Sequence, residues 1–76
     1  MTLTQAKQKY LTEKAKYENS EDRDIESYVN AKMELVDVFL DVAPALFRED
    51  TVSLLRSKRT VDTDKVLGLA LLWADI

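Results

Sequence analysis

The chain has 76 residues, contains no cysteine and no histidine, and carries a net charge of -3 from 14 acidic and 11 basic residues. This composition excludes disulfides, thiolate metal sites and imidazole chemistry, and it disfavours attraction to nucleic acid or an anionic membrane as the leading interaction. One glycine and one proline are far fewer than a loop-rich fold needs, so the composition predicts a single all-α domain.

The first segment, residues 2–18 (TLTQAKQKYLTEKAKYE), is predicted to be a helix with Thr2 or Thr4 as its N-cap. Its apolar side chains recur intermittently, and we expect its tyrosines to pack against the next helix. The opening MTLTQAKQKY resembles the first residues of a small phage-encoded inhibitor of a CRISPR effector nuclease, with which it shares MTLT, an alanine and a Lys-Tyr pair. The likeness covers about an eighth of the chain, and it assigns no residue a role.

Residues 19–24 (NSEDRD) concentrate polar and helix-capping residues, and they are predicted to form a turn in which Ser20 or Asp22 caps the following helix. Acidic residues in this turn stabilise the following helix, because the N-terminal end of a helix dipole is positive. The helix that follows, about residues 22–47, is the central element, because its polar side chains wind in one narrow stripe while almost everything else is apolar. Such a helix has to be covered by other elements on two or three sides.

Pro44 lies inside this apolar run, where a proline removes one helical hydrogen bond and crowds the carbonyl of Leu40. Two outcomes are open: the helix bends near Leu40, or it ends around Val42 and Pro44 opens a new turn. The apolar pattern continues through Leu46 and Phe47 without a change of phase, which favours a kinked helix.

Two shorter helices complete the predicted compact bundle of three or four helices. Residues 51–59 (TVSLLRSKR) are expected to follow Asp50 as the N-cap and to bury Val52, Leu54 and Leu55.

The last helix begins between residues 60 and 64 and runs to the C-terminus with almost no polar face. Two such apolar helices carry more apolar surface than a small domain covers, so we expect a homodimer. The predicted interface is the last helix, the apolar back of the central helix, or both, and its residues on the last helix are Leu67, Leu69, Leu71 and Trp73. The apolar run of this helix is too short to span a bilayer, and the polar first residues of the chain show no signal peptide, so we expect a cytoplasmic protein without a membrane partner.

Four acids reproduce a metal-binding spacing, because Glu18 and Glu21 form an ExxE pair, twelve residues follow, and Glu34 and Asp37 form an ExxD pair. This spacing resembles the magnesium signature of the all-α nucleotide pyrophosphohydrolases, the MazG and dimeric dUTPase group. The resemblance implies that carboxylates from two helices hold Mg²⁺ against a nucleoside triphosphate. The first pair lies in a polar turn, where the family has a helix, so this enzyme is kept as the alternative function.

The function that we predict is that of a small non-enzymatic regulator or inhibitor, of the kind that phages and mobile elements encode, which binds another protein. The chain offers no nucleophile with a base and no glycine-rich phosphate loop, and we expect neither a metal nor a cofactor. The basic cluster at residues 56–59 precedes a helix with aliphatic side chains where base-reading residues are needed, so direct binding of nucleic acid is not expected.

The surface predicted to bind the partner is either the apolar last helix or an acidic stripe on the central helix. The acidic stripe consists of Glu26, Glu34, Asp37 and Asp41. Acids spaced about one turn apart on a rigid helix suit a basic site on a partner, and the alternative is that they form only a solvated face. Exposed acids at this spacing repel each other, so the sequence predicts that neutralising them leaves stability unchanged or raises it.

Overall fold

The computed structural model describes residues 2–19 and 25–75, and within these residues it contains helices and no strand. The helices are α1 (Leu3–Asn19), α2 (Ile25–Leu46), α3 (Glu49–Val61) and α4 (Thr63–Ala74). The predicted all-α class is therefore confirmed. The predicted capping residues Ser20 and Asp22, and Glu21 of the ExxE pair, lie outside the described residues.

Helix α1 begins where its sequence offers a reciprocal cap. The backbone N–H of Gln5 donates to Oγ1 of Thr2 at 3.1 Å, and the backbone N–H of Thr2 donates to Oε1 of Gln5 at 2.9 Å. This capping box satisfies two backbone donors at the helix end, and it shows that Thr2 and not Thr4 is the cap.

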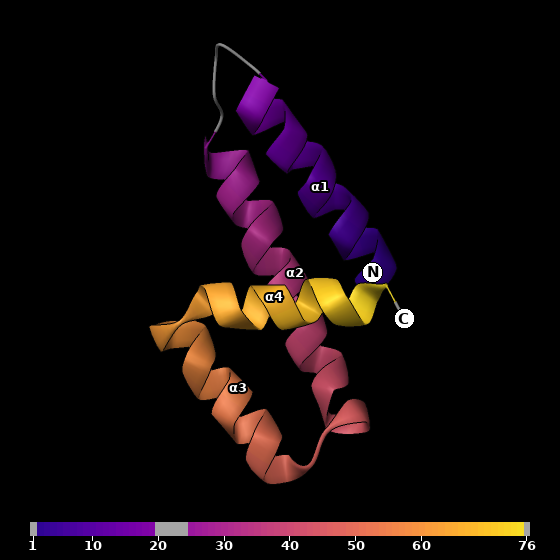
Figure 1. Ribbon diagram of the computed structural model, residues 1–76, viewed down its shortest axis with the longest axis vertical. Helices are drawn as coiled ribbons and strands as arrows, with labels where there is room; N and C mark the ends of the chain where they lie inside the picture. Colours follow the sequence, from indigo (N-terminus) through magenta and orange to yellow (C-terminus); the bar gives the residue numbers. More distant parts are fainter. Residues whose placement is uncertain (1, 20–24, 76) are drawn as a thin grey trace.

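Helices α1 and α2 form an antiparallel hairpin, which extends beyond the α3–α4 pair and gives the molecule dimensions of 43 × 25 × 16 Å (Figure 1). Contacts between tyrosine rings join the two helices. The rings of Tyr10 and Tyr17 lie 5.9 and 5.0 Å from the ring of Tyr28, measured between centroids. The expectation that the tyrosines of the first helix pack against the central one is confirmed.

Helix α2 is the central element, because it contacts α1, α3 and α4. It continues through Pro44 to Leu46 as one helix, so the alternative in which it ends around Val42 is wrong. The bend predicted near Leu40 stays a prediction. The core is centred on the α2 side chains that are completely buried, which are Leu35, Val36, Phe39 and Ala43.

Helix α3 begins at Glu49, two residues earlier than a cap at Asp50 would allow. Arg48 occupies the N-cap position, and Asp50 lies in the first turn, where its Oδ1 accepts a hydrogen bond from the backbone N–H of Thr51 at 2.9 Å. The prediction that Asp50 is the cap is therefore wrong. Its carboxylate still lies at the helix N-terminus, where the helix dipole favours negative charge.

Only part of the predicted apolar face of α3 is buried. Val52 and Leu55 face α2 and α4 and are buried, whereas Leu54 is 57% exposed. Neighbouring residues on a helix point about 100° apart, and the other helices cover α3 on the side of Leu55 but leave the side of Leu54 open. The prediction that Leu54 is buried is wrong for this reason.

Helix α4 follows α3 after a single residue, Asp62, whose φ of -144° and ψ of 70° depart from helical geometry. The chain reverses there, and α4 packs across α2 (Figure 1). Its far end closes the core with aromatic rings: Trp73 meets Phe47 edge to face at 5.3 Å, and Phe47 lies 6.1 Å from Phe39. No helix among the described residues is long and apolar enough to cross a membrane.

Candidate functional site

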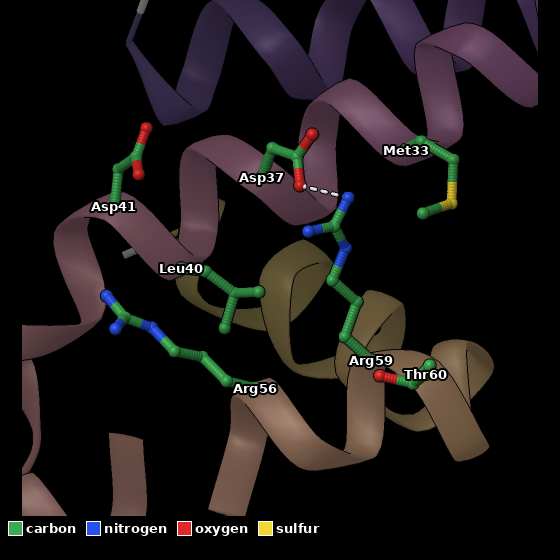
Figure 2. A pocket seen from close by; sticks show the side chains of 7 residues that line it. All are labelled: Met33, Asp37, Leu40, Asp41, Arg56, Arg59 and Thr60. Atoms are coloured by element: carbon green, nitrogen blue, oxygen red, sulfur yellow. Dashed lines mark ion pairs between the residues drawn. The ribbon is translucent and has the colours of Figure 1, made fainter. Parts of the chain in front are cut away.

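A groove of about 890 Å³ lies between α2 and α3 (Figure 2). Its lining residues come from the two helices and are Met33, Asp37, Leu40, Asp41, Arg56, Arg59 and Thr60. We call it the α2–α3 groove.

The helical repeat explains why these side chains share one groove. Asp37, Leu40 and Asp41 are spaced i, i+3 and i+4 on α2, so they lie on one face of that helix. Three residues of α3 have the same spacing and face them: Arg56, Arg59 and Thr60. The groove therefore has an acidic wall and a basic wall on opposite sides of a nearly buried leucine.

One acid and one base of the groove are already joined. The Nη2 atom of Arg59 lies 2.7 Å from Oδ1 of Asp37, and both side chains are about half exposed. Figure 2 shows this pair bridging the two helices. Asp37 thus connects α2 to α3, and its charge is shared with an arginine of the same chain.

The other acid and the other base line the groove without an ion pair. Neither Asp41 nor Arg56 forms an ion pair with any residue that the structure describes. Figure 2 shows the Arg56 side chain reaching towards α2 and the Asp41 carboxylate turned away from α3. A carboxylate and a guanidinium at one end of a groove can bind a peptide segment that carries charges of the complementary sign.

The remaining acids of the acidic stripe lie outside this groove. The Nζ atom of Lys9 on α1 lies 2.7 Å from Oε2 of Glu34, so Glu34 joins α1 to α2. Glu26 is exposed in the first turn of α2, where the helix dipole favours a negative charge. The structure therefore brings only Asp37 and Asp41 together at one site.

The residues predicted to form a dimer interface pack within the single chain. Leu67 is 8% exposed and belongs to the core, and three others are half-buried against that core, namely Leu69, Leu71 and Trp73. The apolar side chain that α4 leaves open is Leu72, which is 61% exposed. The homodimer itself stays a prediction.

Of the four acids with the metal-binding spacing, the structure describes Glu18, Glu34 and Asp37, and their carboxylates do not converge on one point. Among the described residues, no group of three or more acids is close enough to hold a metal ion. Glu34 and Asp37 instead face Lys9 and Arg59, which come from two different helices. The fourth member of the set, Glu21, lies outside the described residues.

The two arginines of the groove belong to the basic cluster at residues 56–59, and the groove itself was not predicted from the sequence. The signal that could have found it is a pair of acids at i and i+4 on α2 and a pair of arginines at i and i+3 on α3. Comparison of the chain with known proteins finds no match among protein-family models, curated proteins or solved structures. The function is therefore argued from the groove.

Proposed function

We propose that this chain is a small, non-enzymatic regulator that binds another protein through the acidic stripe where it borders the α2–α3 groove. The observation that carries the proposal is the carboxylate of Asp41, which forms no ion pair with a described residue and lines a groove of about 890 Å³ together with Leu40 and Met33. Protein interfaces combine apolar contacts with a few polar contacts at their rim, and this groove offers both.

The groove suits a partner segment with an arginine or lysine next to an apolar side chain. The basic group would form a charge-assisted hydrogen bond with Asp41, and the apolar side chain would displace water from Met33, which is half-buried, whereas Leu40 is buried. An acidic group on the same segment would meet Arg56. The net charge of -3 adds long-range attraction towards a basic surface, which raises the association rate.

Regulation would follow from occupancy. A chain of 76 residues that covers a basic surface of its partner blocks that surface for other acidic ligands. Inhibition by such a chain needs no catalytic group, because affinity alone decides how much of the partner is occupied.

The test uses Asp41→Asn with Glu18→Gln as the matched control, since Glu18 is an exposed acid on α1, away from the groove. Proteins captured by the immobilised wild-type chain from its source cell are identified, and the affinity of each purified candidate is measured with all three chains. We expect Asp41→Asn to weaken binding about tenfold, chiefly through the association rate, with Glu18→Gln close to wild type. The wild-type affinity should fall as salt rises.

A partner that binds Asp41→Asn and the wild-type chain equally, with no dependence on salt, would contradict the proposal. The rate constants are measured with the chains immobilised and the partner in solution. A general loss of folded chain then lowers the amount of partner bound and leaves both rate constants unchanged.

A further inference from the structure

A second hollow lies on a different side of the molecule, between α3 and α4. The two helices form a V with Asp62 at its apex (Figure 1). The hollow between them has a volume of about 190 Å³ and is lined by Leu54, Leu55, Lys58, Lys65, Val66 and Leu69. We call it the α3–α4 hollow.

The α3–α4 hollow has the size and character of a socket for one apolar side chain. Its wall is formed by aliphatic groups, and an apolar cavity of about 150 Å³ is large enough to bind benzene. The hollow therefore accommodates one leucine or phenylalanine side chain.

Exposed apolar surface continues from the hollow along both helices. Leu54 on α3 is 57% exposed, and Leu72 on α4, one turn beyond Leu69, is 61% exposed. Gly68 lies on the same face of α4, where a Cβ atom would meet nothing within 4 Å. The face is open, and it is longer than the socket alone.

The charges at the rim of this face are basic, although the whole chain is acidic. Lys58 forms no ion pair with a described residue, and Lys65 lies 3.4 Å from Asp62 in an exposed pair of the kind that contributes little stability. Both amino groups can therefore turn towards an acidic ligand. Because the charges beside the face are basic, the apolar segment that fits the face is one flanked by acidic residues.

The α3–α4 hollow is independent of the α2–α3 groove, although α3 contributes to both. At 100° per residue, Leu54 and Lys58 lie on one side of α3, whereas Arg56 and Thr60 lie on the opposite side. A ligand in the hollow and a ligand in the groove would not touch each other.

We propose that the α3–α4 hollow binds an acidic amphipathic helix of a partner protein. One leucine or phenylalanine of that helix fills the hollow, its next apolar side chain packs on Leu72, and glutamates or aspartates beside them meet Lys58 and Lys65. This is recognition of a helix by a groove, in which apolar anchors recur at i, i+3, i+4 and i+7 and the flanking charges set the preference.

The experiment titrates isotope-labelled protein with synthetic helical peptides and follows the amide signals by NMR. The probe carries leucine and phenylalanine at the anchor positions and glutamate at the flanking positions, and a second probe has lysine in place of every glutamate. We expect the glutamate probe to shift the amides around the hollow and to bind at least about tenfold more tightly than the lysine probe.

Two variants and a control test the site. Leu54→Gln should weaken the glutamate probe at least about tenfold, whereas Ile25→Gln, at a side chain with the same exposed fraction of 57% on α2, should leave it unchanged. Lys58→Glu with Lys65→Glu should reverse the preference towards the lysine probe. Asp41→Asn should not affect either probe, which separates this proposal from the proposed function of the groove.

The proposal is overturned when the probes bind equally, when Leu54→Gln binds as the wild-type chain does, or when the shifts fall on other surfaces. It is also overturned when sedimentation shows a wild-type dimer that Leu54→Gln converts to a monomer, because a second copy of the chain would then be the occupant. A folded spectrum of each variant is required before its binding is interpreted.

Discussion

The ion pair between Asp37 and Arg59 should make a measurable contribution to stability, and it reverses what the sequence predicts for one acid of the acidic stripe. Two unit charges at the observed 2.7 Å attract each other by about 1.5 kcal/mol in water. Both side chains are about half exposed, and ordering them opposes this attraction, so the expected coupling is about 0.2–1 kcal/mol.

The measurement is a double-mutant cycle with Asp37→Asn, Arg59→Gln and the double variant, each unfolded in urea and by heat under far-UV circular dichroism. A coupling of about 0.5 kcal/mol corresponds to a change in Tm of about 2–4 °C for a domain of this size. The coupling should shrink between about 0.01 M and about 1 M salt, as the Debye length falls from about 30 to about 3 Å.

Asp41→Asn is the control, since Asp41 lines the same groove and forms no ion pair with a described residue. Its substitution should leave the free energy of unfolding unchanged within about 0.5 kcal/mol or raise it, because Asp41 repels Asp37 one turn away. A coupling of zero at low salt would refute the argument, as would a larger loss of stability in Asp41→Asn than in Asp37→Asn.

Three further predictions concern stability away from the groove. Gly68→Ala should raise the free energy of unfolding by about 0.5–1 kcal/mol in urea, because the added Cβ meets nothing within 4 Å, and a loss would show that something packs there. Thr2→Ala should lower it by about 1 kcal/mol by removing the cap that pairs with Gln5, with Thr2→Ser close to wild type. Burial and a hydrogen bond with Tyr28 raise the pKa of Tyr10 from 10.0 to about 12, so the folded chain keeps a proton that the unfolded chain loses. Stability should therefore fall between pH 10 and about 12, by up to about 1.4 kcal/mol per pH unit, and Tyr10→Phe should remove most of this slope.

Features of the structure that depend on nearby residues could be predicted from the sequence. The cap of α1 is an example, since Thr2 and Gln5 are three residues apart and satisfy each other. The continuation of α2 through Pro44 is another, because the apolar phase on either side of the proline is the same. Periodicity within one helix carries this kind of information without any knowledge of the other helices.

Features that depend on which helices meet could not be predicted. Asp37 and Asp41 look equivalent in the sequence, and the difference between them arises only because α3 places Arg59 beside one of them. In the same way, Leu54 and Leu55 are identical residues, and only the position of α4 decides that Leu55 is buried and Leu54 is exposed. Side-chain pairs between helices are set by tertiary packing, which a single sequence does not display.

The oligomeric state and the α3–α4 hollow are linked by the same argument. The sequence predicts a dimer because two apolar helices seem to need more cover than a small domain provides, but α2 contacts all three other helices, and Leu67 and Trp73 of α4 pack against the core of the same chain. What α4 leaves exposed is Leu72, on the face that it shares with Leu69 and the hollow. Because an acidic helix and not a second copy is the proposed occupant of this face, the glutamate probe should leave the sedimentation of the chain unchanged, and a dimer that the probe dissociates would make a second copy the occupant.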